Sequence, residues 1–174
     1  MRQIEFRGKR KDNGEWVYGL YYAEPFYDGE DVYIEHVHII ITEQGNKYEV
    51  IPETVSQFTG MKDSTKWEEL TEKEQKAWLA TGKTKEEWKG REIYEGDVVE
   101  KTNPKCQYQK SIIHCIVVWE DDRYMLKVCN VFLWEHYNVE KPENGTFLFF
   151  SWIHKDCYKI IGNTTDNHEL LEAK

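Results

Sequence analysis

The segment that decides the fold of this chain reads Gly90-Arg91-Glu92-Ile93-Tyr94-Glu95-Gly96-Asp97-Val98-Val99. It places a turn signal, Gly96-Asp97, directly before a β-branched apolar run. Glycine supplies the backbone freedom that a tight turn needs, and an aspartate carboxylate accepts hydrogen bonds from turn amides. The pattern therefore predicts a turn that leads into a strand over 98–101, with Asp97 shaping the backbone.

The residues that follow this turn alternate between apolar runs and polar breaks. The most apolar run is interpreted as a central strand buried on both faces, because only His114 in it is polar. The predicted strands are 111–119, 124–130, 146–154 and 158–162. Short strands joined by turns are typical of small barrels and sandwiches. We therefore predict a small SH3-like β-barrel or roll in the carboxy-terminal half.

Residues 64–89, on the other side of the segment, have a helical pattern. They hold two pairings of a threonine with a glutamate three residues later, Thr71 with Glu74 and Thr84 with Glu87. In such a capping box the two side chains satisfy the free amides of a first helical turn. The pattern predicts one helix, which stops near Gly82, and a further short turn. The tryptophans in this stretch are interpreted as core contacts, with docking of a partner as the alternative.

The first third of the chain predicts β-hairpins. Asn13-Gly14 supplies the positive backbone angles of a tight turn between strands over 3–10 and 15–22. Pro25, Asp28 and Gly29 predict a loop over 23–31. Further strands are predicted over 32–42 and 47–51.

The chain is thus predicted to be mainly β. We expect an amino-terminal hairpin region over 1–63, a helical insertion over 64–89, and the SH3-like region over 90–174. The alternative is that 1–63 and 90–174 form one compact unit.

Charge and composition narrow the classes of function. The formal net charge is -9, and aromatic residues make up 14% of the 174 residues. An acidic chain disfavours binding to nucleic acid, which requires a basic surface. The only dense basic run, Arg7 to Lys11, lies beside Asp12 and Glu15 and is interpreted as a solvated hairpin. The aromatics favour core and interface packing.

Compartment is predicted from what the sequence lacks. We expect neither a signal peptide nor a membrane span, because no apolar stretch has the required length. The cysteines, which form no Cys-x-x-Cys pair, are Cys106, Cys115, Cys129 and Cys157. Reduced thiols are therefore expected, and the predicted location is the cytoplasm.

Candidate sites for chemistry are weak. Asp97, with Glu92, Glu95 and Glu100 nearby, could hold a divalent ion, but a structural role in the turn is favoured. His36 and His38 share one face of a predicted strand and could begin a zinc site, although ordinary sheet histidines are favoured. No phosphate-binding glycine loop or hydrolase motif occurs. We expect no catalytic residues, no metal site and no cofactor.

Four stretches of this chain together resemble the YopX family of phage and prophage proteins. They are Ile4-Glu5-Phe6-Arg7, Gln57-Phe58-Thr59-Gly60-Met61-Lys62-Asp63, Gly90 to Val99, and Ile161-Gly162-Asn163 with Asn167-His168-Glu169-Leu170-Leu171. The resemblance implies motif residues with a structural or interaction role. These are Gln57, Phe58, Thr59, Gly60, Asp63, Gly90, Ile93, Tyr94, Glu95, Gly96, Asp97, Gly162 and Asn163.

The resemblance also implies that residues 64–89 are an insertion. In simpler members of the family the motifs that end at Asp63 and begin at Gly90 are almost adjacent. The two ends of the insertion are therefore expected to lie close in space. The resemblance agrees with an SH3-like carboxy-terminal part and supplies no reaction.

The function expected from these observations is that of a non-enzymatic phage or prophage accessory protein in a bacterial host cell. It would act by protein–protein association, either with another copy of itself or with a host or phage protein. The first alternative is a nucleic-acid-binding small-barrel module that uses the Arg7 to Lys11 hairpin. The second is a metal-dependent enzyme that uses Asp97 and its acidic neighbours.

Overall fold

The computed structural model describes residues 4–29, 32–102, 110–135, 140–149 and 157–171. The chain forms two compact units, 1–60 and 61–174, and each is described by itself. Both are mainly β, as predicted. Among the described residues, no helix has the length and apolar character needed to cross a membrane. The three-part division expected from the sequence stays a prediction.

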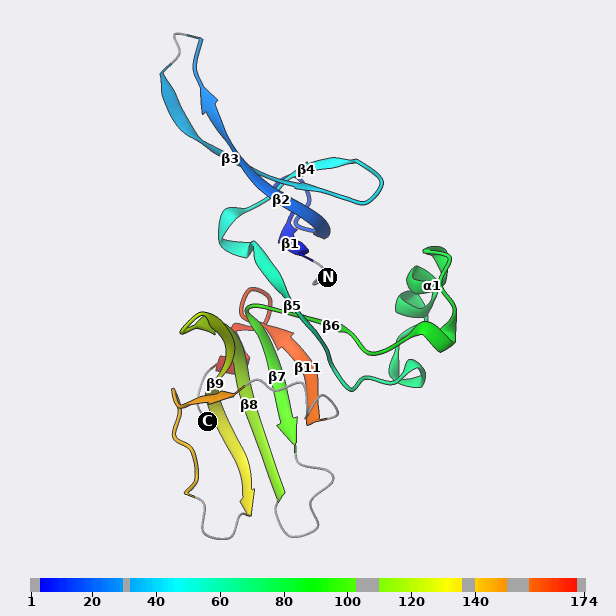
Figure 1. Ribbon diagram of the computed structural model, residues 1–174, viewed down its shortest axis with the longest axis vertical. Helices are drawn as coiled ribbons and strands as arrows, with labels where there is room; N and C mark the ends of the chain where they lie inside the picture. Colours follow the sequence, from blue (N-terminus) through cyan, green and yellow to red (C-terminus); the bar gives the residue numbers. More distant parts are fainter. Residues whose placement is uncertain (1–3, 30–31, 103–109, 136–139, 150–156, 172–174) are drawn as a thin grey trace. The chain divides into compact units, whose positions relative to one another are not determined.

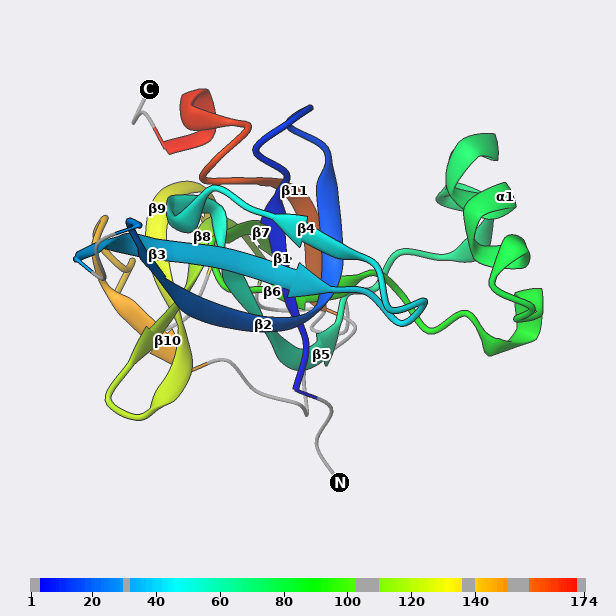
Figure 2. The same cartoon turned by 90° about the horizontal axis from the view of Figure 1, so that it is seen from above.

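The first unit is an antiparallel sheet with the strand order β4-β3-β2-β1-β5 (Figures 1 and 2). Its elements in chain order are β1 (Phe6–Lys9), β2 (Trp16–Tyr27), β3 (Tyr33–Ile41), β4 (Lys47–Glu49), a 3-10 turn (Pro52–Thr54) and β5 (Ser56–Lys62). Strand β5 runs across the boundary into the second unit.

The predicted Asn13-Gly14 hairpin is confirmed. Gly14 has φ 72°, and its amide donates to the carbonyl of Arg10 at 2.9 Å. Strands β1 and β2 then pair from Lys9 and Trp16 outward. Ile40 and Val50 are buried in this unit, and both lie within 3.3 Å of the position that a Cβ on Gly8 would take. The close approach explains why the strand carries glycine there.

The predicted loop over 23–31 is wrong in its first half. Strand β2 continues to Tyr27 and pairs with β3 along its whole outer length, with Pro25 opposite His36. Proline lacks the amide that a central strand donates, but it is tolerated where one side of a strand has no neighbour. Within the described ranges, strand β1 pairs with β2 only as far as Gly19, and this condition therefore holds at Pro25.

The second unit holds a five-stranded antiparallel sheet in the order β10-β9-β8-β7-β11. The elements given by its described residues are 3-10 turns (Trp67–Glu69, Lys85–Glu87 and His168–Leu171), the helix α1 (Glu72–Ala80), and the strands β6 (Glu92–Tyr94), β7 (Asp97–Thr102), β8 (Lys110–Glu120), β9 (Arg123–Glu135), β10 (Phe147–Phe149) and β11 (Tyr158–Asn163). Closure of this sheet into an SH3-like barrel stays a prediction, and residues 150–154 of the predicted strand 146–154 lie outside the described residues.

The predicted central position of this strand is confirmed by β8, which pairs with both β7 and β9, but only one of its two faces is fully buried. Alternate residues Ile113, Cys115 and Val117 are fully buried, while the residues between them are half-buried. The buried face therefore supplies the core, where Leu126 of β9 and Tyr158 of β11 pack against it.

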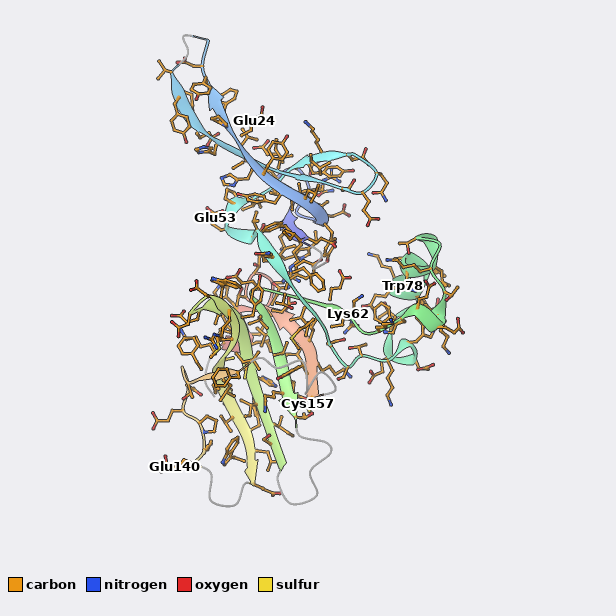
Figure 3. The ribbon with its side chains drawn as sticks, viewed as in Figure 1. Glu24, Glu53, Lys62, Trp78, Glu140 and Cys157 are labelled. Atoms are coloured by element: carbon orange, nitrogen blue, oxygen red, sulfur yellow. The ribbon has the colours of Figure 1, made fainter. Side chains whose placement is uncertain are left out.

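The helical insertion also follows its sequence signals. The Thr71 hydroxyl accepts from the Glu74 amide at 3.3 Å, and the Glu74 carboxylate accepts from the Thr71 amide at 2.8 Å, which completes the capping box of α1. The second box caps only a 3-10 turn. Two edge-to-face ring contacts join Trp67 and Trp78 to Trp88 at 6.2 Å and 5.0 Å. The three tryptophans thus form a small cluster within the insertion, and Figure 3 labels one of them, Trp78.

We expect Cys115 to resist alkylation in the folded protein. Burial, helped by the neighbouring Cys129 thiol, raises the pKa of Cys115 from 9.0 to about 12. At about pH 8 the reactive thiolate is then roughly one in 10,000 molecules. Iodoacetamide labelling followed by peptide mass spectrometry should modify Cys115 in urea and leave it unmodified in buffer.

The same shift predicts how stability changes with pH. Unfolding returns the Cys115 pKa to about 9.0, so the unfolded chain loses this proton first. The free energy of unfolding is therefore unaffected by this thiol below about pH 9, and it falls as the pH rises from about 9 toward 12. Rapid labelling of Cys115 under native conditions would contradict this burial.

Candidate functional site

Asp63, the last residue of its family motif, joins three separate segments of the second unit. It is 4% exposed. One carboxylate oxygen accepts from the amides of Thr65 at 3.0 Å and Arg91 at 2.7 Å. The other accepts from the Thr65 hydroxyl at 2.6 Å and the Ile160 amide at 3.2 Å. A carboxylate with this many donors is a structural junction rather than an open ligand site.

The junction fastens both ends of the insertion, as expected from the family resemblance. The Asp63 amide donates to the Arg91 carbonyl at 2.8 Å, and the Ser64 amide donates to the Tyr158 carbonyl at 2.8 Å. Arg91 also pairs with Glu74, whose Oε1 lies 2.8 Å from Nη2. Glu74, the second residue of the Thr71–Glu74 capping pair, is thereby linked to Arg91, which directly precedes β6.

Gly90 is required at this junction for two reasons. Its φ is 100°, in the region that residues with a side chain rarely adopt. A Cβ at this position would lie 2.0 Å from the carbonyl oxygen of Asp63. The glycine therefore permits the contact between the two backbones.

A second structural cluster surrounds Gly96 and Asp97. The Asp97 carboxylate, in a residue that is 1% exposed, accepts from the Tyr94 amide at 2.8 Å. Gly96 has φ 77°, donates to the Val117 carbonyl and accepts from the Thr164 amide. The predicted turn role of Asp97 is confirmed.

Gly162 and Asn163 close the same cluster from the end of β11. The Asn163 side-chain oxygen accepts from the amides of Thr165 and Asp166 at 2.9 Å and 2.8 Å. The Asn163 amide donates to Asn167 at 3.2 Å, and Asn167 lies so close to Gly162 that a Cβ there would meet its oxygen at 2.5 Å. These motif residues build a turn.

The remaining motif residues lie within strands or at their ends. Phe58 and Thr59 are buried in β5, where Gln57 pairs with Phe6 and Gly60 has φ 82°. Two others, Ile93 and Tyr94, are 0% and 1% exposed, and Glu95 is half-buried. The geometry gives these residues structural surroundings, and an interaction role for them stays a prediction.

The histidines and acidic residues considered as metal ligands are not joined by further ligands in the described part of the chain. Among the described residues, no three histidine, cysteine or acidic side chains gather as a metal site. His36 shares a hydrogen bond of 2.8 Å with the Tyr33 hydroxyl, and His38 shares one of 2.6 Å with Tyr21. In both histidines the bonded ring nitrogen is Nδ1.

The feature that sequence reasoning missed is the outer part of the β2–β3 hairpin. We call residues 22–38 the arm; Figure 1 shows it as the blue hairpin that extends from the sheet of its unit, and Figure 3 labels Glu24 on it. Along the arm β2 pairs with β3, and at its base the Val50 amide donates to the His38 carbonyl at 2.8 Å. The exposed apolar side chains of the arm, each 49% to 54% exposed, are Phe26, Tyr27, Val32, Tyr33 and Ile34.

One face of the arm carries a row of rings. The Tyr33 ring lies 6.1 Å from Tyr27 and 5.3 Å from His36 between centroids. Nearer the sheet, the Tyr21 ring stacks on His38 at 5.9 Å and lies 5.4 Å from Phe6. The rings that are half-buried beside the sheet thus continue outward as exposed ones.

The other face mixes acid and apolar side chains. Glu24 and Phe26 are two residues apart on β2 and so point the same way, and Glu35 lies opposite Phe26 on β3. Side chains directly opposite in an antiparallel pair share a face. Phe26 is therefore flanked by two carboxylates.

The fold is mainly β, and the motif residues around Asp63 and Asp97 hold separate backbone segments together by hydrogen bonds. The family model described as YopX protein matches residues 80–172, just over half of the chain. The chain belongs to the YopX family. A comparison with curated proteins found no match. The arm lies outside the matched residues.

We predict that Gly90→Ala destabilises the second unit by more than about 3 kcal/mol, because it combines backbone strain with a clash against the Asp63 carbonyl. Gly82→Ala is the matched control: its φ is 80°, but no atom lies within 4 Å of the new Cβ. It should cost only about 1 kcal/mol. Urea denaturation followed by tryptophan fluorescence measures both. Equal losses for the two variants would show that the Gly90–Asp63 contact is not needed.

Proposed function

We propose that this protein is a non-enzymatic phage or prophage accessory protein of the bacterial cytoplasm that acts by binding another protein through its arm. The observation that carries the proposal is the exposed apolar surface of the arm. Contiguous exposed apolar side chains mark interaction sites in soluble proteins. Tyrosine and phenylalanine are also enriched at the centres of protein interfaces.

The arm is better suited to side-chain recognition than to pairing with a further strand. An exposed strand edge invites pairing, and proteins oppose it with proline, bulges and charge. The arm has all three: Pro25, a bulge after Phe26, and acidic residues such as Glu24 and Glu35. We therefore favour a partner whose surface receives the side chains of the arm.

The nucleic-acid alternative gains no support from the contacts of the basic run. Arg7 is buried at 8% exposure and donates to the Ser56 hydroxyl, contrary to the predicted solvated hairpin. Arg10 pairs with Asp12, and Lys11 pairs with Glu49. These cations are engaged within their own unit.

The SH3-like barrel remains part of the proposal, and self-association is the alternative to a complex with a different protein. A barrel would place the edges β10 and β11 of the five-stranded sheet near each other. Self-association would make a second copy of the chain the partner of the arm, and light scattering distinguishes this outcome from a complex with a different protein.

We predict that Phe26→Ser combined with Ile34→Ser abolishes capture of the partner. Each side chain is 52% exposed, so their loss should leave the fold intact. Removal of two central apolar contacts should weaken an interface by about 3 kcal/mol or more, which is at least a hundredfold. Tagged protein would be used to capture partners from a lysate of the host bacterium, with quantitative mass spectrometry.

The matched control is Leu79→Ser combined with Phe132→Ser, whose side chains are 49% and 55% exposed in the second unit. The partner should be a protein that the wild type and this control both retain and the arm variant loses. The proposal fails if the arm variant retains every captured protein and the wild type is monomeric.

A further inference from the structure

The acidic charge of this chain is concentrated around the arm. Residues 12–46 hold eight of the 32 acidic residues and none of the 23 lysines and arginines. The other 139 residues therefore carry 24 acids against 23 bases, a net charge of -1. Nearly all of the formal net charge of -9 belongs to one continuous segment of 35 residues.

This segment contains the arm itself. Glu24, Asp28, Glu30, Asp31 and Glu35 fall within residues 22–38, together with the exposed aromatic side chains. A field of one sign over an exposed surface raises the rate of encounter with partners of the opposite sign and opposes partners of the same sign. Nucleic acids and anionic membranes are thus disfavoured as occupants of the arm.

A second copy of this chain is also a poor occupant. Two arms would repel each other, and the rest of the chain is nearly neutral. The dense basic run that could attract an arm is engaged internally, since Arg10 contacts Asp12 and Lys11 contacts Glu49. The charge pattern therefore points to a different protein.

The spacing of side chains on the arm refines the chemistry of that partner. Carboxylates of Glu24 and Glu35 flank the exposed Phe26 ring on one face, while Tyr27 and Tyr33 present rings near the tip. A matching surface has an apolar recess for the phenylalanine with lysine or arginine around it. Cationic side chains are also attracted to the faces of tyrosine rings.

Resting on the proposed function, we propose that the arm docks onto a basic protein surface in which lysine or arginine side chains surround an apolar recess. The carboxylates of Glu24 and Glu35 set the sign of charge that the arm accepts, and Phe26 supplies the apolar contact.

Three fluorescent peptides of about twelve residues test this with full-length protein. One combines lysine and leucine, one combines lysine and serine, and one combines glutamate and leucine. Fluorescence anisotropy should show the lysine–leucine peptide binding at least tenfold more tightly than either of the others. Raising NaCl from roughly 0.05 to 0.5 M should weaken it by tenfold or more, because the Debye length shortens from over 10 Å to a few ångströms.

Charge variants locate the binding. Glu24→Gln combined with Glu35→Gln should weaken the lysine–leucine peptide by tenfold or more. Glu72→Gln combined with Glu140→Gln removes the same charge from exposed positions in the second unit and should leave binding within twofold. Circular dichroism melting should show all variants folded.

Two results would overturn the inference. One is a lysine–leucine peptide that fails to bind at low salt or binds both charge variants equally. The other is a glutamate–leucine peptide that binds as tightly as the lysine–leucine peptide. Neither result affects the proposed function, which is decided separately by whether Phe26→Ser with Ile34→Ser loses a captured protein.

Discussion

The second unit depends on one buried carboxylate. Asp63 accepts hydrogen bonds from residues that lie 2, 28 and 97 positions further along the chain. A buried carboxylate is costly unless its oxygens are saturated with donors, and here four donors meet it. The result is that the start of the insertion, its return at Arg91 and strand β11 cannot separate without leaving a charge unsatisfied.

This junction explains how a helical segment can be tolerated inside a β protein. Because the two ends of the insertion are held together, the strands before and after it keep their pairing whatever the length of the segment between them. The insertion adds contacts of its own, since Lys159 of β11 pairs with Glu69 at 2.9 Å and the Trp88 indole donates to the Thr65 carbonyl at 2.9 Å. It is therefore a braced element that depends on the junction.

Local signals predicted the parts of the fold that local chemistry decides. Asn13-Gly14 and the Thr71–Glu74 box each act within a few residues, and both form as expected. The apolar run of β8 also predicted its central position in the sheet, although one face of the strand is fully buried and the other only half-buried. The four hydrogen bonds that the Asp63 carboxylate accepts could not be predicted from the sequence, because two of the donors lie 28 and 97 residues away.

The arm escaped prediction for a different reason. Pro25, Asp28 and Gly29 are loop signals on propensity alone, yet pairing with β3 outweighs them as far as Tyr27. The informative signal was the absence of lysine and arginine from 12–46, which is a property of charge pattern rather than of secondary structure. This local excess of acidic residues is present in the sequence, but the net charge of the whole chain does not show where the charge lies.

The acidic charge of the arm has two effects: it opposes association between copies of the arm, and it selects the charge of the partner. An exposed ribbon with phenylalanine and tyrosine side chains would associate with its own copies, and uniform acidity opposes this by repulsion. Protection from self-association by repulsion alone could use charges of either sign. The exclusion of basic residues over 35 positions also opposes anionic partners and favours cationic ones. The same carboxylates that keep the unbound arm from associating with itself therefore restrict what can cover it.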